Sequence, residues 1–270
     1  MSNYLKSPLR YPGGKSRIVS ILYNKFPVFS EYREPFIGGG SVFLYLMSFK
    51  PQLKFWINDL YYDVYNFWNQ VKNDGHFLIR HNVTEWRDKF TDGRELFKYL
   101  RENYDSFDDV KKASAFFVLN RISFSGTTMS GGFSKDAFEK RFTDSSIIRL
   151  ATVERWFPCD NTIVTNLDYS ALLEAEGEDV FIFMDPPYYT AEKSNLYGKN
   201  GSTSKGFDHA KFADGCRKCT YKWLITYDDC DYIRELFKGF DIEPISFSYG
   251  MKNVSKSSSM KGNEIIIKNY

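Results

Sequence analysis

The sequence predicts an α/β fold built on a parallel sheet, with a helical segment inserted into it. Strand-like and helix-like patterns alternate before residue 73 and again after residue 158, whereas residues 74–157 show no convincing strand. Such alternation is typical of parallel sheets, because each parallel strand needs a long crossover, usually a helix, before the next one. We therefore expect residues 1–73 and 158–270 to form one domain and residues 74–157 to form a second, helical domain.

The first alternation can be followed element by element. Residues 17–26 have the pattern of a helix, and EPFIGGGSVFLYLM, residues 34–47, contains an apolar helix that opens on a glycine-rich turn. KFWIND, residues 54–59, is predicted to be a buried strand ending at Asp59. The apolar spacing of residues 60–73 then predicts a further helix. With the short, turn-bounded segment at residues 29–35 as the first strand, the chain begins strand–helix–strand–helix, which favours a parallel sheet.

The second alternation begins after residue 158. Strand-like runs occur at residues 161–166, 179–189 and 222–229. Helical patterns follow the first and the last of these runs. Residues 240–249 and 263–268 are expected to close the sheet as an antiparallel pair.

Two polar loops interrupt these patterns. The first, SFSGTTMSGGFSKDAF, lies at residues 123–138, among helical patches at 95–104, 109–122 and 144–156. The second, residues 193–206, contains three lysines and no acidic residue. It cannot bury enough apolar surface to offset the entropy of ordering its backbone. We predict that this second loop is mobile until a phosphate-rich partner binds its lysines.

Composition excludes several classes of protein. The chain has 270 residues, 43% of them hydrophobic and 18% aromatic, which is enough for a sizeable core and unlike a disordered chain. No apolar run approaches the roughly 18 residues of a membrane span, and no secretory signal is recognised at the N-terminus, so we expect a cytoplasmic protein. The four cysteines and three histidines have no zinc-ligand spacing, so no metal is expected.

Charge is informative only through its distribution. The net charge of +2 does not by itself indicate a nucleic-acid-binding protein. Residues 1–33 contain six basic side chains against one acidic side chain, and residues 250–270 contain four against one. If both segments lie beside one cleft, they form a basic rim suited to phosphates. Charge alone favours the simpler interpretation of an ordinary solvated surface.

LRYPGGKS, residues 9–16, ends like a phosphate-binding P-loop. That motif needs a glycine separated by four residues from the Gly-Lys-Ser, and Leu9 occupies that position. The loop should also follow a hydrophobic strand, and residues 1–8 contain no strand-like run. The sequence therefore opposes a P-loop nucleotide hydrolase, and another role is needed for this glycine pair and lysine.

The glycine turn FIGGGS predicts a binding site for an adenosine. Gly38 and Gly40 fit the start of a dinucleotide fingerprint, but the third glycine is missing. Asp59 ends the next strand, where a carboxylate can accept hydrogen bonds from both ribose hydroxyls. Together these features favour an adenosine-containing ligand without a pyrophosphate. A tight turn with a solvent-exposed aspartate is the alternative.

DPPYY, residues 185–189, follows the apolar strand VFIFM at its carboxyl end. The two prolines have no N–H group, so this segment presents carbonyl oxygens and the Asp185 carboxylate beside the ring of Tyr188. An acceptor-only cluster next to an aromatic ring suits an amino group on a stacked ring, such as the exocyclic amine of adenine. The alternative is a purely structural turn.

The order of these motifs resembles that of one enzyme family. RYPGGK, EPFIGGGSVF, Asn58-Asp59 and DPPY occur as in the Dam-type (α-group) DNA adenine-N6 methyltransferases, and NLDYSALL, TYDD and KGNEIIIKN extend the match over nearly the whole chain. The resemblance implies the class I S-adenosylmethionine-dependent methyltransferase fold, a Rossmann-like sheet of seven strands with one reversed. It also implies that residues 74–157 are an inserted helical target-recognition domain.

The resemblance further implies a reaction and its residues. The family transfers a methyl group from S-adenosyl-L-methionine to N6 of adenine in duplex DNA after base flipping. The implied catalytic residues are Asp185, Pro186, Pro187 and Tyr188. The implied cofactor-binding residues are Tyr11, Gly13, Gly14, Lys15, Glu34, Pro35, Phe36, Gly38, Gly40, Asp59, Leu167, Asp168 and Asp185. The expected DNA-binding residues are Asn120, Arg121, Ser125, Lys135, Lys199 and Lys256.

Some questions stay open at this point. NRISFSGTTMSGGFS starts like the family's recognition segment, but its later positions do not match the members that read GATC, so the target sequence is not predicted. Methylation of RNA or of a free nucleotide, and a non-catalytic DNA-binding relative, are the remaining alternatives. A cognate restriction enzyme is a candidate partner, and we expect a monomer.

Overall fold

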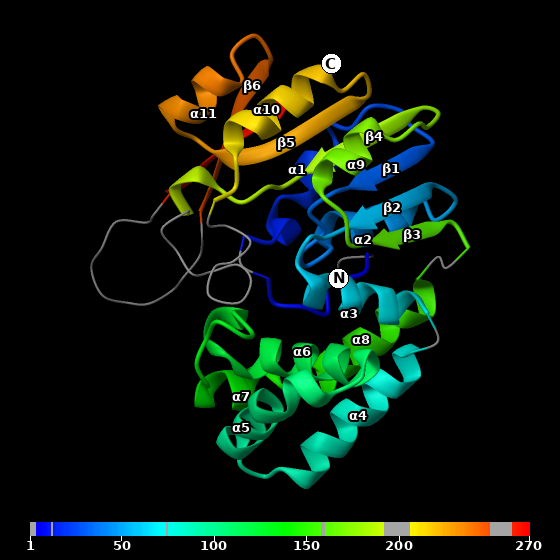
Figure 1. The fold of residues 1–270 in the computed structure, drawn as a ribbon, viewed down its shortest axis with the longest axis vertical. Coiled ribbons are helices and arrows are strands. Elements are labelled where there is room, and N and C mark those ends of the chain that lie inside the picture. The colour runs from blue at the N-terminus through cyan, green and yellow to red at the C-terminus, as the bar shows by residue number, and fades with distance from the viewer. Residues whose placement is uncertain (1–3, 12, 74, 158–159, 192–205, 249–260) are drawn as a thin grey trace.

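The fold is described from a computed structural model, which places residues 4–11, 13–73, 75–157, 160–191, 206–248 and 261–270. A twisted sheet and its helices make up the upper part of Figure 1, and a group of helices lies below the sheet. The predicted mobile loop at residues 193–206 falls, except for its last residue, outside the described residues.

The described residues form one sheet of seven strands in the order β3-β2-β1-β4-β5-β7-β6. The first five strands in this order are parallel, whereas β7 is antiparallel to both of its neighbours. The strands are β1 (Glu31–Glu34), β2 (Lys54–Asn58), β3 (Thr162–Thr165), β4 (Val180–Met184), β5 (Lys222–Asp228), β6 (Asp241–Ser248) and β7 (Lys261–Lys268). This topology confirms the predicted seven-stranded α/β fold with one reversed strand.

Helices cover both faces of the sheet, which explains why its central strands are apolar throughout. Along β4, Phe181 and Phe183 face one core cluster, whereas Ile182 and Met184 face the other. Side chains alternate across a strand, so a strand buried on both faces shows no polar alternation. One face packs on α1 (Val19–Tyr23), α2 (Ser41–Phe49) and α3 (Tyr62–Lys72), and the other on α9 (Tyr169–Glu174), α10 (His209–Lys218) and α11 (Asp231–Leu236).

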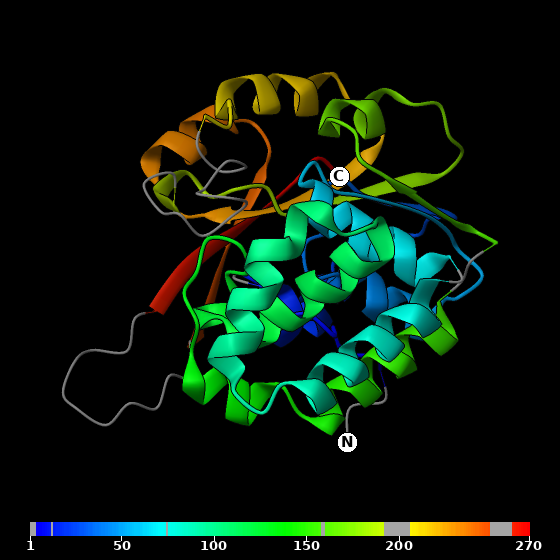
Figure 2. The ribbon, with the colours of Figure 1, turned by 60° about the horizontal axis from the view of Figure 1, so that its bottom comes forward.

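The helical segment is organised around one central helix. Its helices are α4 (Gly75–Lys89), α5 (Gly93–Asn103), α6 (Asp109–Ile122), α7 (Lys135–Arg141) and α8 (Asp144–Trp156). Every residue of α6 from 113 to 122 is buried, and α6 contacts α3, α4, α5 and α7. Figure 2 brings this segment forward, in front of the sheet.

The core runs without a break from the sheet into the helical segment. Phe43 of α2, Phe67 of α3, Phe117 of α6 and Leu150 of α8 belong to the same buried cluster. The rings of Phe67 and Phe117 are stacked, with their centroids 6.3 Å apart. The placement of the two domain boundaries remains a prediction.

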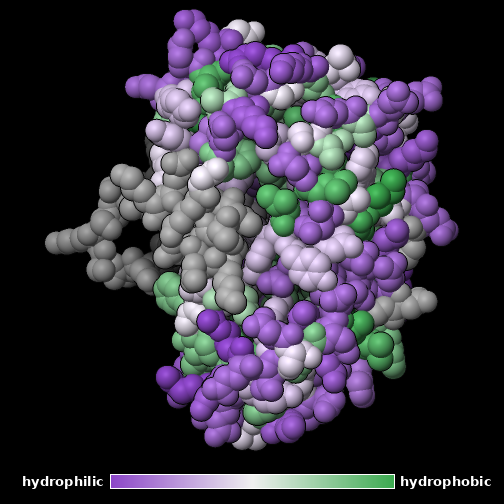
Figure 3. Space-filling view, in the orientation of Figure 1, coloured by the Kyte–Doolittle hydropathy of each residue, from purple (hydrophilic) through white to green (hydrophobic). Residues whose placement is uncertain are grey.

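The N-terminal helix is shorter than the sequence predicts. Instead of one helix over residues 17–26, the chain forms a short 3₁₀ turn, η1 (Lys15–Arg17), followed by α1. None of the described helices is long and apolar enough to cross a membrane. Hydrophilic residues dominate the face shown in Figure 3, and the hydrophobic ones on it are scattered in small groups.

Candidate active site

One pocket opens at the carboxyl ends of the parallel strands. It is lined by the loops after β1, β2, β3 and β4 and by the N-terminal segment. Of the predicted cofactor-binding residues, all except Gly13 line it. The four residues of the DPPY motif line it as well. The sequence-predicted catalytic and cofactor residues thus lie together in one site, although they come from distant parts of the chain.

The geometry of the turn after β1 requires glycine at two positions. Gly38 and Gly40 have φ angles of +44° and +66°, the left-handed region that side chains disfavour. A Cβ atom at Gly38 would lie 2.8 Å from the ring of Tyr11, and one at Gly40 would lie 2.6 Å from the ring of Trp68. The turn is therefore held between two aromatic rings, and its backbone faces the pocket.

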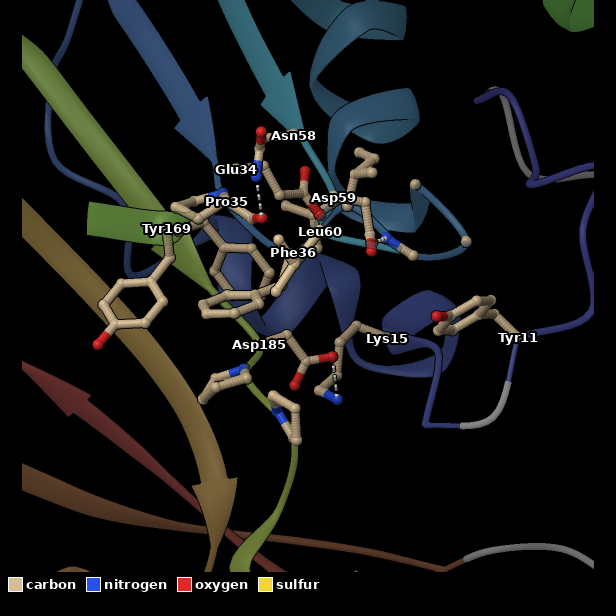
Figure 4. Close-up of a pocket in the computed structure, with 18 of the residues that line it drawn as sticks. Tyr11, Lys15, Glu34, Pro35, Phe36, Asn58, Asp59, Leu60, Tyr169 and Asp185 are labelled. Carbon is tan, nitrogen blue, oxygen red and sulfur yellow. Dashed lines mark hydrogen bonds and ion pairs between the residues drawn. The ribbon is translucent and has the colours of Figure 1, made fainter. Parts of the chain in front are cut away.

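Asp59 fixes this turn from the end of β2. Its Oδ2 accepts a hydrogen bond from the N–H of Gly38 at 2.9 Å, and its Oδ1 accepts one from the N–H of Tyr61 at 2.9 Å. Burial raises the pKa of Asp59 to about 6. The carboxylate therefore has a structural task that the sequence did not predict, and it lies at the wall of the pocket beside the glycine turn (Figure 4).

Asn58 joins three strand ends beside the pocket. Its Nδ2 donates to the carbonyl of Pro35 at 3.0 Å and to that of Leu167 at 2.9 Å. Its Oδ1 accepts from the N–H of Leu167 at 2.8 Å and from the hydroxyl of Thr165 at 2.7 Å. Since the amide is fully used and buried, Asn58 places Leu167 at the pocket wall and is itself a positioning residue.

Lys15 and Asp185 form an ion pair at the centre of the site. The Lys15 Nζ lies 2.7 Å from the Asp185 Oδ2 and also donates to the carbonyl of Gly13 at 2.7 Å (Figure 4). The hydroxyl of Thr226 donates to the Asp185 Oδ1 at 2.8 Å. The Lys15 ammonium also lies over the ring of Tyr188, 5.1 Å from its centroid. The segment with the glycine pair therefore places Lys15 against the carboxylate of the DPPY motif. A phosphate-binding loop would not explain this contact.

Two further carboxyl groups support the site. Asp228 ends β5, and its oxygens accept the N–H groups of Tyr189 and Thr190 at 3.0 and 2.9 Å, which fixes the chain directly after DPPY. Glu34 accepts the hydroxyl of Tyr32 at 2.7 Å. Burial raises the pKa of Glu34 well above its ordinary value, so the site favours its neutral form.

The residues expected to contact DNA lie in different environments. Ser125 and Lys135 are exposed on and beside the loop that follows α6. Phe124 is 70% exposed beside Ser125, which has a φ of +53°. Phe124 was not singled out from the sequence, because an aromatic residue in a polar loop can be either buried or exposed. Lys199 and Lys256 lie outside the described residues.

Asn120 requires a correction, because its side chain is fully buried. Its Oδ1 accepts the N–H of Arg10 at 2.7 Å, and its Nδ2 donates to the carbonyls of Arg10 and Gly126 at 2.8 and 3.0 Å. Both amide N–H groups are used and the side chain has no exposed surface, so in this arrangement it does not face DNA. Asn120 instead ties the N-terminal segment to the loop after α6. Arg121 is also buried, at 4% exposure.

Comparison with known proteins agrees with this geometry. The chain is 27% identical to the DNA N-6-adenine-methyltransferase of Escherichia phage P1, over 97% of this chain and 35% of the phage protein. It is 25% identical to the Type II methyltransferase M.MjaIII of Methanocaldococcus jannaschii, over 98% of this chain and 99% of that protein. It is 26% identical to the DNA adenine methylase of Vibrio cholerae, over 88% of this chain and 86% of that protein.

A search against protein families gives the same answer and confirms the family expected from the ordered motifs. Residues 11–251 match the family described as D12 class N6 adenine-specific DNA methyltransferase. The matched range contains both the N-terminal glycine pair and the DPPY motif. The chain belongs to the D12 class of N6 adenine-specific DNA methyltransferases.

Proposed function

We propose that this protein transfers the methyl group of S-adenosyl-L-methionine to N6 of adenine in duplex DNA. The observation that carries the proposal is the cluster of acceptors at residues 185–187, which opens into the pocket formed by the glycine turn. The family supplies the reaction class. The geometry supports the assignment of this cluster to the target amine.

The residues of the pocket fit S-adenosylmethionine. The left-handed glycines pack against the rings of Tyr11 and Trp68 where a Cβ atom would have no room, so the turn presents backbone and no side chain to the pocket. Asp59 would accept the ribose hydroxyls, and Leu167 and Asp168 would contact the adenine. Tyr11 and the glycine pair would cover the methionine end. When bound, the cofactor supplies an electrophilic methyl carbon on a sulfonium group.

The acceptor cluster would activate the target amine. The lone pair of adenine N6 is delocalised into the ring, so N6 is a poor nucleophile. Hydrogen bonds from its two N–H groups to the Asp185 carboxylate and the Pro186 carbonyl would favour a tetrahedral nitrogen and stabilise the developing positive charge. Thr226 and Lys15 hold the carboxylate in place for this task. Asp185 need not be a strong base, because proton loss can follow methyl transfer.

Duplex DNA requires the target base to leave the stack. Extrusion costs a few kcal/mol, and stacking on the ring of Tyr188 would return roughly 1–3 kcal/mol. The exposed Phe124 and Ser125 form the surface that would face the bases left behind.

The names of the archaeal and Lactococcus relatives as type II methyltransferases support a restriction enzyme as a candidate partner.

A direct assay tests the proposed function. Purified protein is incubated with S-adenosylmethionine and, in parallel, with plasmid DNA, duplex RNA or free adenosine nucleotides. The products are then digested and analysed for N6-methyladenosine species by mass spectrometry. We expect methylation of the plasmid DNA, and long-read sequencing of that DNA then identifies the target sequence. Methylation confined to RNA or nucleotides would refute the proposal.

Asp59 is expected to make cofactor binding dependent on pH. Its ionised form accepts the ribose hydroxyls best, so affinity should fall as the pH decreases through about 6. Without cofactor the effect on stability has the opposite sign. The pKa of this carboxyl is 3.8 in the unfolded chain, and folding raises it to about 6. Between these two values the folded protein holds a proton that the unfolded chain has lost. The free energy of unfolding therefore decreases as the pH rises from 3.8 to about 6. Calorimetric titration between pH 5 and 8 measures the affinity.

Two variants separate these effects. Asp59→Ala should weaken cofactor binding by roughly 1.5–3 kcal/mol, the value of hydrogen bonds to a charged acceptor. Asp59→Asn keeps the shape of the side chain but has no proton to lose, so the pH dependence near 6 should disappear. An unchanged dissociation constant in both variants would show that the ribose contact is wrongly assigned.

The loop after α6 is expected to carry sequence preference. Residues 123–136 should be exchanged for those of a Dam-type relative that reads GATC, with Gly126 retained. This glycine must stay because an added Cβ would lie 2.3 Å from the carbonyl oxygen of Arg10. The exchange should alter the methylated sites but not cofactor affinity. Identical methylated sites before and after the exchange would place specificity elsewhere.

A further inference from the structure

The end of β5 supports the DPPYY loop, residues 185–189, through three consecutive residues. The hydroxyl of Thr226 donates to the carboxylate of this loop, and the carboxylate of Asp228 accepts one of its N–H groups. Between them, Tyr227 faces the core cluster on the other side of the sheet. There its ring lies against that of Tyr188, with the centroids 6.0 Å apart. Tyr227 is thus the side chain behind the ring on which the target base would stack.

Tyr227 carries a hydroxyl group into an apolar part of the core. Its side chain is fully buried, and its ring contacts the buried rings of Phe212 and Phe237. The hydroxyl is hydrogen-bonded to Nδ1 of His209, which is 4% exposed and begins α10. Burial, followed by the charge of Asp228, holds the pKa of Tyr227 well above its ordinary value. The hydroxyl therefore keeps its proton and remains a hydrogen-bond donor.

His209 also packs against two aromatic rings near the site. The ring of Tyr189 meets the imidazole in an edge-to-face arrangement, with the centroids 5.4 Å apart, and that of Phe207 does so at 5.0 Å. Phe207 lines the cofactor pocket, and Tyr189 directly follows Tyr188 in the chain. One imidazole therefore contacts the pocket wall and the DPPYY loop, and it is hydrogen-bonded to the ring behind Tyr188.

Stability alone does not explain this buried polar pair. Replacing both partners of a buried hydrogen bond by apolar side chains of similar shape is close to neutral, because neither partner is left unpaired. Apolar side chains would fill the same space, since the surrounding cluster is built from apolar residues. What they would lose is the direction of the hydrogen bond, which fixes how one ring lies against the next. The pair is therefore better explained by the need to orient Tyr227.

We propose that His209 is a positioning residue for methyl transfer. Its hydrogen bond holds the ring of Tyr227, and Tyr227 in turn holds the ring of Tyr188 at the angle at which the target adenine stacks on it. This inference rests on the proposed function, since it needs an adenine in the pocket. A base tilted away from the reactive angle presents its amino group poorly to the Asp185 carboxylate. The hydrogen bond would thus affect the rate of transfer more than cofactor binding.

Two single variants and their combination test this assignment. Tyr227→Phe leaves His209 Nδ1 without its donor, and His209→Leu leaves the buried hydroxyl without its acceptor. Each should lower the thermal midpoint by about 2–4 °C. The double variant should regain the wild-type midpoint, because neither polar group remains. Single-turnover methyl transfer to duplex DNA should nevertheless be roughly tenfold slower in all three variants.

The fluorescent base 2-aminopurine reports the stack itself. It replaces the target adenine in a duplex whose methylated site has been identified by long-read sequencing. Its emission is quenched when it stacks on an aromatic ring, so the three variants should give stronger emission than the wild type at saturating protein. Tyr188→Leu supplies the reference signal for a base without its stacking partner. Cofactor affinity should be unchanged in Tyr227→Phe, since Tyr227 is not among the described residues that line the pocket.

Tyr221→Phe is the matched control. Tyr221 directly precedes β5, at the end of the strand away from Tyr227, and its hydroxyl donates to the carbonyl of Ala175 at 3.0 Å. Loss of this hydrogen bond should lower the thermal midpoint by a similar amount without slowing methyl transfer. His209→Asn adds a rescue, because its amide oxygen can accept the Tyr227 hydroxyl. It should therefore transfer methyl groups faster than His209→Leu.

The outcomes separate this inference from the proposed function. If the wild type methylates duplex DNA and the double variant has the same rate and the same 2-aminopurine emission, the inference alone is overturned. Equal slowing in Tyr221→Phe would show that only stability matters, and it would overturn the inference as well. Absence of methyl transfer by the wild type would refute the proposed function, and this inference with it.

Discussion

Replacement of Asp185 by alanine is expected to reduce methyl transfer below detection, a loss of at least about 10³-fold. Cofactor affinity should stay within about tenfold, because the carboxylate serves the target amine. Single-turnover assays with saturating cofactor and DNA measure the chemical step directly. Near-normal turnover would remove Asp185 from the mechanism.

The contacts of Asp185 allow a graded version of this experiment. Thr226→Val removes the donor to Oδ1 while keeping the side-chain shape, so it should slow transfer by roughly tenfold. Asp214→Ala changes an exposed aspartate on α10 that pairs with Arg217, and it serves as the matched control with normal turnover. Equal rates in all three variants would mean that the acceptor cluster is structural.

The sheet could be predicted because its signal is local. KFWIN and VFIFM become β2 and β4, and each is followed directly by the carboxylate that the sequence singled out. Parallel strands place their carboxyl ends at one edge, so the strand pattern alone places Asp59 and Asp185 at the same edge of the sheet. The antiparallel pair β6 and β7 followed from the same kind of local pattern.

The contacts between distant segments could not be predicted in the same way. Lys15 and Asp185 are 170 positions apart, and no pattern in either segment indicates an ion pair between them. Asp228 likewise looks like any aspartate at a strand end until the structure shows it accepting two N–H groups of the DPPYY loop. Periodicity reports which side of an element is buried, but not which distant side chain it meets.

The misassignment of Asn120 has the same origin. A polar residue beside an arginine in a recognition segment resembles a DNA contact, and the helical pattern of residues 109–122 does not reveal burial on every side. Ten consecutive buried residues in α6 leave no solvent-facing stripe, because α3, α4, α5 and α7 all contact it. In such a helix a polar side chain must find its partners within the protein.

Asn120→Ala is therefore expected to lower both the free energy of unfolding and the affinity for the cofactor, in addition to any change in sequence preference. Three hydrogen bonds are lost, and the N–H of Arg10 and two carbonyls lose their partner, so the free energy of unfolding should fall by roughly 2–4 kcal/mol. Cofactor affinity should fall too, because Arg10 leads directly into the segment that carries Tyr11 and Lys15. Denaturant unfolding and calorimetry measure the two effects.

Two matched variants show whether the contact between Asn120 and Arg10 couples the loop after α6 to the cofactor pocket. Asn103→Ala removes one amide hydrogen bond within the helical segment, to the carbonyl of Tyr99, and should leave cofactor affinity unchanged. Gly126→Ala disturbs the same contact from the loop after α6, because the added Cβ would collide with the Arg10 carbonyl oxygen. It should therefore also reduce cofactor affinity. Normal stability and cofactor affinity in Asn120→Ala, with altered methylation sites, would instead restore Asn120 as a DNA contact. Loss of cofactor affinity in both Asn120→Ala and Gly126→Ala would mean that a change in the loop after α6 alters the cofactor pocket. Because such coupling is reciprocal, cofactor binding would then change DNA affinity by the same factor.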